Sequence, residues 1–157
     1  MIEIERKFRV KSTTFLDNIK TRFKITQGYL NSDKNRTVRV RTKDSQGFIT
    51  VKGVSSANGL SRFEWEKEIS STDAARLLEL CEGFVIDKTR YLVPFGEVVF
   101  EVDVFEGANQ GLVIAEVELQ SEGQIFEKPD WLGEELTGDK RYYNAYLSVH
   151  PFTTWNR

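Results

Sequence analysis

Pairs of like charges, two residues apart, recur along the sequence. They are Glu3/Glu5, Arg39/Arg41, Glu64/Glu66, Lys88/Arg90, Glu101/Asp103 and Glu116/Glu118, and Lys7 follows the first pair at the same spacing. Alternate residues of a β-strand point to the same face, so each pair would project side by side from one face of a sheet. Like charges held together repel unless something of opposite sign lies between them. The spacing therefore indicates a surface that binds charged ligands.

Two kinds of ligand would reduce the repulsion within the basic and the acidic clusters. An arginine pair offers planar two-point contacts to phosphate oxygens, and a lysine adds a point charge. Clustered carboxylates supply the oxygen ligands that Mg²⁺ or Mn²⁺ prefers, whereas only His150 could offer an imidazole nitrogen and only Cys81 a thiolate. The combination predicts an inorganic polyphosphate or a nucleotide, bound together with a divalent cation.

The same alternation also occurs on the solvated face of an ordinary antiparallel sheet, where cross-strand salt bridges would explain the mixed signs. For any single strand that explanation is the simpler one. Two features of the whole chain favour a binding site instead. The polar face of strand after strand carries charged residues rather than Ser, Thr, Asn or Gln. Within each strand these charges are mostly of one sign. In a closed barrel such clusters would face inward, where an unpaired charge is costly.

Short segments of alternating polarity, separated by turn residues, predict most of the secondary structure. Strands are expected at Ile2–Val10, Lys24–Leu30, Thr37–Thr42, Phe48–Lys52, Arg62–Ile69, Ile86–Val93, Val98–Phe105 and Leu112–Leu119. Helices are expected at Ser71–Glu82, near Thr13–Phe23 and near Asp139–Val149. The hairpin-like succession predicts a mainly β (α+β) fold. We expect a closed or nearly closed eight-stranded antiparallel barrel, with helices packed outside over its apolar face and a C-terminal helix.

Length and composition exclude several classes of protein. The 157 residues fit a single domain, residues 1–157, and 22 basic residues nearly balance 24 acidic ones at a net charge of −2. That balance is unlike a general binder of nucleic acid duplexes or of membranes. No apolar run is long enough to cross a membrane, and Met1 leads into charge rather than into a signal peptide. We expect a cytoplasmic monomer or homodimer that acts on a small molecule.

The segment Glu3-Ile-Glu5-Arg-Lys7 resembles the ExExK signature of the CYTH superfamily, whose members are also called triphosphate tunnel metalloenzymes. The resemblance covers nearly the whole chain, through Tyr29, Arg39-Val-Arg41, Lys52, Arg62-Phe-Glu64-Trp-Glu66, Lys88-Thr-Arg90, Asp103 and Glu116-Val-Glu118. The family fold is an antiparallel β-barrel of eight strands that forms a triphosphate-binding tunnel. In appearance the chain is similar to the compact bacterial inorganic triphosphatases.

The resemblance implies a role for each charged residue. The phosphates of the substrate would be bound by Lys7, Arg39, Arg41, Lys52, Arg62, Lys88 and Arg90. Mg²⁺ or Mn²⁺ would be held, directly or through supporting contacts, by Glu3, Glu5, Glu64, Glu66, Asp103, Glu116 and Glu118. Tyr29 together with Lys52 would form the catalytic pair that activates water. Arg62 is equally compatible with a different role, that of a partner for the acids.

The implied activity is metal-dependent hydrolysis of a triphosphate in the tunnel, with inorganic tripolyphosphate giving pyrophosphate and phosphate. Three alternatives use the same triphosphate grip: a class IV-type adenylyl cyclase, which makes cyclic AMP and pyrophosphate from ATP, a thiamine triphosphatase, and a non-catalytic module that binds polyphosphate or nucleotide. The full set of acids, with Lys7, Tyr29 and Lys52, argues against a pure binder.

Overall fold

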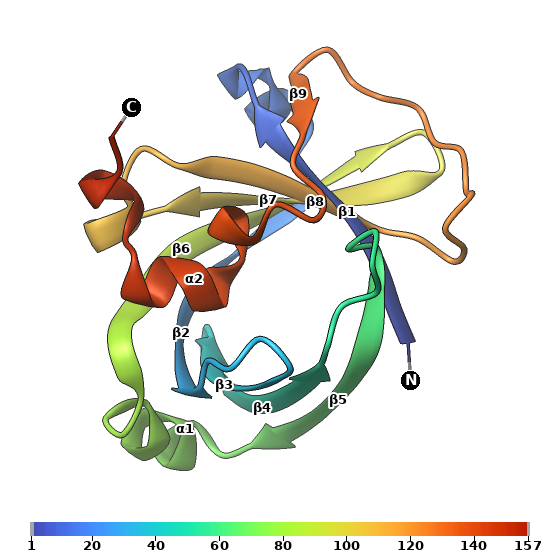
Figure 1. The fold of residues 1–157 in the computed structure, drawn as a ribbon. Helices are drawn as coiled ribbons and strands as arrows, with labels where there is room; N and C mark the ends of the chain where they lie inside the picture. The colour runs from blue at the N-terminus through green and yellow to red at the C-terminus, as the bar shows by residue number, and fades with distance from the viewer. Residues whose placement is uncertain (1, 157) are drawn as a thin grey trace.

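The computed structural model describes residues 2–156, and its main feature is a nine-stranded antiparallel sheet. The strands are β1 (Ile2–Val10), β2 (Thr21–Asn31), β3 (Arg36–Lys43), β4 (Gln46–Gly53), β5 (Ser61–Ile69), β6 (Glu82–Phe95), β7 (Val98–Phe105), β8 (Val113–Glu118) and β9 (Leu132–Glu135). Their order is β5-β4-β3-β2-β6-β7-β8-β1-β9, and β5 also pairs with β1. Eight strands therefore close into a barrel, and β9 is an additional strand on the far edge of β1 (Figure 1).

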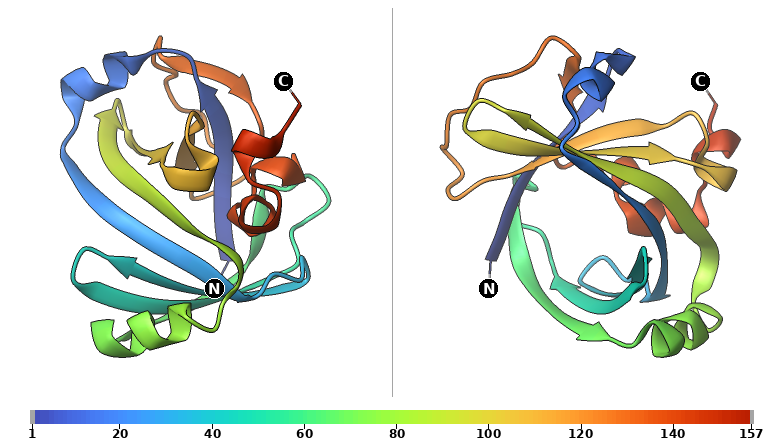
Figure 2. Two further views of the ribbon diagram at one scale, coloured as in Figure 1. Left: turned by 90° about the vertical axis from the view of Figure 1, so that its left-hand side faces the viewer. Right: turned by 180° about the vertical axis from the view of Figure 1, so that it is seen from behind.

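The barrel closes through the first residues of β1. Ile2, Glu3 and Ile4 pair with Phe63, Arg62 and Ser61 of β5. From Glu5 onward β1 pairs instead with β8, and farther along it also pairs with β9. The strand thus crosses from one side of the barrel to the other, as the views in Figure 2 show. Glu3 of β1 therefore lies beside β5, and Glu5 lies beside β8, so the acids of β1 lie between two other charged strands.

All eight predicted strands are present, and those at Ile2–Val10 and Val98–Phe105 have the predicted bounds. The ninth strand, β9, was not predicted because its four residues carry no alternating pattern. The helix predicted to reach Glu82 ends at Leu78, since β6 already begins at Glu82. Gly83 follows there in a left-handed conformation (φ 68°), where a Cβ would lie 2.5 Å from the carbonyl oxygen of Ser148.

The helices cover separate parts of the barrel. Helix α1 (Ser71–Leu78) begins at Ser70, whose hydroxyl accepts a hydrogen bond from the backbone N–H of Asp73. It packs outside β2, β3 and β4. The predicted C-terminal helix is a 3₁₀ turn, η3 (Lys140–Tyr142), followed by α2 (Asn144–Val149), and these lie across one end of the barrel (Figure 1). The segment near Thr13–Phe23 forms only the 3₁₀ helix η1 (Thr13–Asn18) before β2 begins.

Two apolar clusters stabilise the shell around the tunnel. One joins β7 and β8 to η1 and the segment before β9, with Phe15, Phe100 and Trp131 at its centre. The other joins β6 and β8 to the C-terminal helices, around Ile86 and Leu147. Among residues 2–156 no helix is long and apolar enough to cross a membrane.

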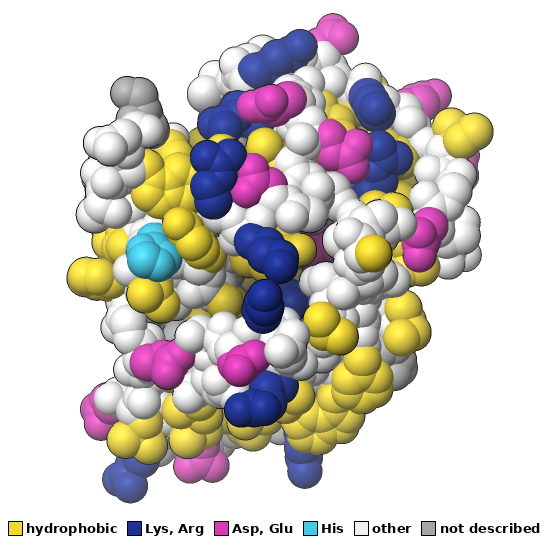
Figure 3. Space-filling model, viewed as in Figure 1, with side chains coloured by type: hydrophobic (Ala, Val, Ile, Leu, Met, Phe, Trp, Pro, Cys, Tyr) yellow, Lys and Arg dark blue, Asp and Glu magenta, His cyan; other side chains and the backbone are white. Residues whose placement is uncertain are grey.

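Helices pack outside the barrel, as expected, but they leave the outer face of β5 uncovered. Phe63 and Trp65 on its outer face are 48% and 47% exposed, and Ile2 beside them is 65% exposed. Figure 3 shows hydrophobic side chains on this side of the molecule. The physical reason is topological: α1 follows β5 directly and turns back over β4, β3 and β2, so β5 keeps an uncovered outer face.

Candidate functional site

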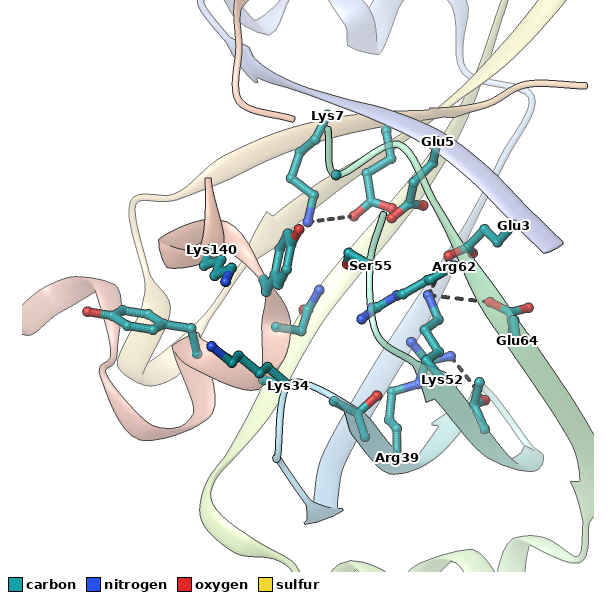
Figure 4. A pocket seen from close by; sticks show the side chains of 18 of the residues that line it. Glu3, Glu5, Lys7, Lys34, Arg39, Lys52, Ser55, Arg62, Glu64 and Lys140 are labelled. Carbon is teal, nitrogen blue, oxygen red and sulfur yellow. Dashed lines mark hydrogen bonds and ion pairs between the residues drawn. The ribbon is translucent and has the colours of Figure 1, made fainter. Parts of the chain in front are cut away.

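The inward faces of all eight barrel strands line one cavity of about 460 Å³, which α2 and η3 partly close at one end. Figure 3 shows basic side chains around the hollow at the centre of this face, and Figure 4 shows the charged groups pointing into it. The predicted site residues that line the cavity are Glu3, Glu5, Lys7, Tyr29, Arg39, Arg41, Lys52, Arg62, Glu64, Glu66, Arg90, Glu116 and Glu118. The two remaining predicted residues, Lys88 and Asp103, lie beneath the lining and are each 1% exposed.

One wall of the cavity is acidic because β1 and β8 run side by side. Glu5 lies opposite Glu118 in the strand register, and Lys7 lies opposite Glu116. Burial, followed by the neighbouring charge of Glu116, raises the pKa of Glu5 well above its ordinary value. Burial, followed by Glu3 and Glu101, also raises the pKa of Glu118. The acids on this wall therefore lack sufficient positive charge from the protein alone.

Glu116 is the exception on the acidic wall. Burial acts to raise its pKa, but Lys7 and Arg90 outweigh burial and hold that pKa well below its ordinary value. The Lys7 Nζ lies 3.6 Å from Glu116 Oε1 and donates a hydrogen bond to the carbonyl oxygen of Tyr142 at 3.0 Å. Glu116 is thus an anion, beside a Glu5 carboxyl that tends to keep its proton.

The opposite wall is cationic and is built on β3. Arg39 Nη2 donates to Thr50 Oγ1 at 3.1 Å, and Arg41 Nη2 donates to Glu66 Oε1 at 3.3 Å. The Thr50 hydroxyl in turn donates to Glu66 Oε1 at 2.8 Å. Burial, followed by the charges of Arg39 and Arg90, lowers the pKa of Arg41 to about 10. A bound anion would relieve the repulsion that this shift reports.

Lys52 connects the two walls. Its Nζ lies 2.8 Å from Glu3 Oε1 and 3.3 Å from Glu64 Oε2, as Figure 4 shows. Burial acts to lower the pKa of Lys52, but the charges of Glu5 and Glu3 outweigh burial and raise it. The side chain is therefore an ammonium group, able to donate hydrogen bonds but unable to accept a proton.

Arg62 and Lys7 share an aromatic neighbour. The guanidinium of Arg62 lies 5.6 Å from the ring centre of Tyr143, and Lys7 Nζ lies 5.2 Å from the same centre. Within residues 2–156 Arg62 has no acidic partner within 4.0 Å. Of the two roles left open for it, partnering the acids has no ion pair behind it among these residues.

Asp103 is held by two cations below the floor of the cavity. Lys88 Nζ lies 2.7 Å from Asp103 Oδ2, and Arg90 makes two hydrogen bonds to the same carboxylate, at 2.8 and 2.9 Å. Burial acts to raise the pKa of Asp103, but Arg90 and Lys88 outweigh it and lower that pKa. Burial lowers the pKa of Lys88 to about 8 despite Asp103. Lys88 also donates to Asn144 Oδ1 at 3.1 Å.

Tyr29 has two environments. It lines the cavity, and its ring belongs to the apolar cluster around Ile86 and Leu147. Its side chain is 5% exposed, and its cross-strand neighbour on β3 is Arg39. The ring therefore packs in the apolar cluster, and the residue also forms part of the cavity lining.

Several residues of the site carry no sequence signal of their own. Thr50 shares a face with Lys52, so strand alternation could have included it, but its contact with Glu66 depends on strand pairing. Lys34 follows β2, and Tyr143 precedes α2; both line the cavity far from any repeated charge pattern. Figure 4 shows Lys34 and Lys140 on the other side of the cavity from Glu3 and Glu5.

Within residues 2–156, no three acidic, His or Cys side chains already converge closely enough to hold a metal ion. The chemistry of the acidic wall nevertheless fits a divalent cation, because its donors are oxygens and two of its acids, Glu5 and Glu118, have raised pKa values. Binding an ion here would require these flexible side chains to turn toward one another.

Comparison with known proteins agrees with this geometry. The CYTH domain family matches residues 1–145. The chain is 47% identical to an inorganic triphosphatase of Acetivibrio thermocellus over 151 residues, which cover 96% of this chain and 95% of the relative. It is 42% identical to an inorganic triphosphatase of Nitrosomonas europaea over 154 residues, which cover 95% of this chain and 98% of the relative. The crystal structure of the inorganic triphosphatase NE1496 superposes with a TM-score of 0.68 at 36% identity and covers 94% of each chain. The chain therefore belongs to the CYTH family.

Proposed function

We propose that this protein is a metal-dependent inorganic triphosphatase, which hydrolyses tripolyphosphate to pyrophosphate and phosphate inside its tunnel. The observation that carries the proposal is the charge arrangement of one cavity, whose lining combines cations from β3, β4 and β6 with acids of β1 and β8. The two curated relatives, which match almost the full length, are inorganic triphosphatases and support the same substrate.

The cations of the lining bind the substrate's phosphates. Arg39, Arg41 and Arg62 offer planar two-point contacts, and Lys7 and Lys52 offer point charges. These five side chains come from four different strands, so they surround an elongated anion rather than contact one end of it. A tripolyphosphate, with its charge spread along three phosphates, fits this distribution better than a single phosphate does.

Lys88 and Arg90 have a shared anchor. Both contact Asp103, and these buried contacts fix Lys88 beneath the cavity and Arg90 at its lining. We assign Asp103 chiefly to this anchoring, since coordination of a metal would first require its contacts with both cations to open. Arg90 lines the cavity and reaches the substrate directly, whereas Lys88 contributes its charge from below.

The reaction is attack of water on a terminal phosphorus. The new P–O bond forms as the bond to the bridging oxygen breaks, pyrophosphate leaves with that electron pair, and the water gives up a proton. Tyr29 orients the water or accepts its proton, while Lys52, which is held as an ammonium, donates hydrogen bonds to the reacting phosphate. Lys52 is not assigned as the base, because its pKa is raised and its ammonium group contacts Glu3.

Triphosphatases of this family generally depend on a divalent metal. In this chain Glu3, Glu5, Glu116 and Glu118 would hold Mg²⁺ or Mn²⁺, with Glu64 and Glu66 as supports that bind the neighbouring cations. When bound, the ion neutralises negative charge on the phosphate oxygens. The raised pKa of Glu5 agrees with this assignment, since a cation would replace the proton that burial now favours.

A substrate panel tests the proposal. Tripolyphosphate, ATP and thiamine triphosphate are each supplied with Mg²⁺ or Mn²⁺, and phosphate, pyrophosphate and cyclic AMP are measured. We expect tripolyphosphate to give the highest kcat/KM and to release phosphate and pyrophosphate in equal amounts. Cyclic AMP as the main product from ATP would replace hydrolysis by cyclisation, and no turnover of any substrate would favour a binding module.

Chelation and a matched variant test the metal. In excess chelator, hydrolysis of tripolyphosphate should cease and should return when Mg²⁺ or Mn²⁺ is added back. Glu5→Gln keeps the size of the side chain and removes its charge, so it should raise the metal concentration needed for half-maximal rate. Glu134→Gln, at an exposed position on β9, serves as the control. Full activity in excess chelator would contradict the metal requirement.

A further inference from the structure

One wall of the tunnel contains a glutamine that is fully buried and has no polar partner. Gln27 lies on the inner face of β2, because its neighbour Gly28 faces outward, where a Cβ would lie 2.9 Å from Cys81. The side chain of Gln27 is 0% exposed, and neither its amide nitrogen nor its carbonyl oxygen has a hydrogen-bond partner within residues 2–156. A carboxamide can make several hydrogen bonds, so this position is unusual.

Most of the unpaired buried polar atoms of the described chain lie on the neighbouring strands β2 and β3. Within the described chain, five buried side-chain N or O atoms lack a partner, and four of them are the two amide atoms of Gln27 and the Nε atoms of Arg39 and Arg41. Gln27 is the direct cross-strand neighbour of Arg41. On its other side Gln27 neighbours Ile86, which has no polar side-chain group. The nearest complementary side chain in the strand register is therefore a phosphate-binding arginine.

Folding alone does not account for a glutamine here. Leucine would fill the space beside Ile25 and Ile86 without burying unpaired polar atoms, and such burial is unfavourable. The carbonyl oxygen of Gln27 is an acceptor and the Nε–H of Arg41 is a donor, so the two groups are complementary. In this structure no hydrogen bond joins these two groups, and the Nη2 atom of Arg41 donates to Glu66 at 3.3 Å.

We propose that Gln27 is a positioning residue for the phosphate-binding arginines. When a polyphosphate draws the Nη groups of Arg41 to its oxygens, the carbonyl oxygen of Gln27 accepts a hydrogen bond from the Nε–H of Arg41. This bond fixes the plane of the guanidinium toward the substrate. The inference rests on the proposed function, because it requires an anionic substrate in the tunnel. Gln27 lies behind the lining and acts through Arg41 rather than by touching the phosphates.

The first test separates stability from affinity. Gln27→Leu should raise the melting temperature of the ligand-free protein by about 2–4 °C. It should also weaken tripolyphosphate binding about tenfold, measured by calorimetry in excess chelator so that turnover does not interfere. Ile25→Leu, at the preceding inward position of β2, conserves volume and should leave the affinity unchanged. Wild-type affinity in Gln27→Leu would overturn the proposal, as would a parallel fall in melting temperature and affinity.

The second test asks whether Gln27 acts through Arg41. In an Arg41→Ala background, Gln27→Leu should cause no further loss of affinity, so that the two effects are strongly non-additive. An undiminished tenfold loss in that background would overturn the assigned route. The binding experiments are independent of turnover. If the wild-type protein binds tripolyphosphate but hydrolyses none, the proposed activity fails, and the same double-mutant cycle still decides the role of Gln27.

Discussion

Strand β7 carries two surfaces of opposite chemistry on alternate residues. Phe100 and Val102 are 0% exposed and pack in an apolar cluster, where the ring of Phe100 lies 5.3 Å from that of Trp131. Glu101 and Asp103, on the other face, point toward Arg90. The apolar side of the barrel is close-packed, whereas its tunnel side keeps like charges together and, on β2 and β3, leaves polar atoms of Gln27, Arg39 and Arg41 without partners. The difference indicates that the apolar side stabilises the fold, whereas the charged and polar groups of the tunnel side find their remaining partners in a bound ligand.

The largest expected effect is a loss of stability in the apolar surface. Phe100→Ala should lower the free energy of unfolding by about 3–5 kcal/mol, because it removes a buried ring and leaves a cavity beside Trp131. Urea denaturation measures the loss. Turnover at a temperature where the variant is still folded should stay close to wild type, since the side chain faces away from the tunnel. A large loss of kcat in the folded variant would show that the two surfaces are coupled.

The next effect belongs to the tunnel and concerns turnover. Tyr29→Phe keeps the ring that packs near Ile86 and removes only the hydroxyl. If that hydroxyl orients or deprotonates water, kcat at saturating tripolyphosphate should fall on the order of a hundredfold, with KM and melting temperature nearly unchanged. A folded variant with wild-type kcat would remove Tyr29 from the mechanism. Glu64 or Glu118 would then be the next candidates for the group that orients or deprotonates the water.

A third change should weaken binding without harming the fold. Arg41→Ala removes a buried cation that repels Arg39, so the melting temperature without ligand should stay the same or rise. The affinity for tripolyphosphate should fall by about one to two orders of magnitude, and more than the affinity for orthophosphate, because contacts are most numerous in the longer anion. Equal losses for both anions, measured by calorimetry, would contradict a site matched to triphosphate length.

The smallest effect is expected outside both surfaces. Lys24 and Glu106 form an exposed ion pair, in which a hydrogen bond from Lys24 lowers the pKa of Glu106. Lys24→Ala should cost less than about 1 kcal/mol at pH 7. Because the folded pKa of Glu106 lies below its unfolded value, the pair's contribution is present above the unfolded pKa and is lost as pH falls through the folded one. Urea titrations of both proteins at several pH values should therefore converge in acid. If the difference in unfolding free energy between the two proteins grew as pH falls, the ion pair would not be its source.

The sequence by itself determined which residues share a face. Strand alternation is a local property, fixed by backbone geometry over a few residues, so Glu3 with Glu5 and Arg39 with Arg41 could be placed together before any fold was known. The same local rule gave the bounds of β1 and β7. The uniform sign of each charged pair indicated that an opposite charge lies nearby, but not whether a ligand or another strand supplies it. For Lys88 and Arg90 it is Asp103 of the neighbouring strand.

Only the tertiary structure decided which charges meet. The closure of β1 onto β5 and β8 brings Lys52 to Glu3, and the pairing of β6 with β7 buries Asp103 between Lys88 and Arg90. These contacts depend on strand register and barrel closure, which no short sequence window contains. The same holds for Tyr143, which reaches Lys7 because the C-terminal segment folds back over one end of the barrel. Alternation assigns a side chain to a face, but its partners there lie on other strands, and for Lys7 the partner Tyr142 is more than a hundred residues away in the chain.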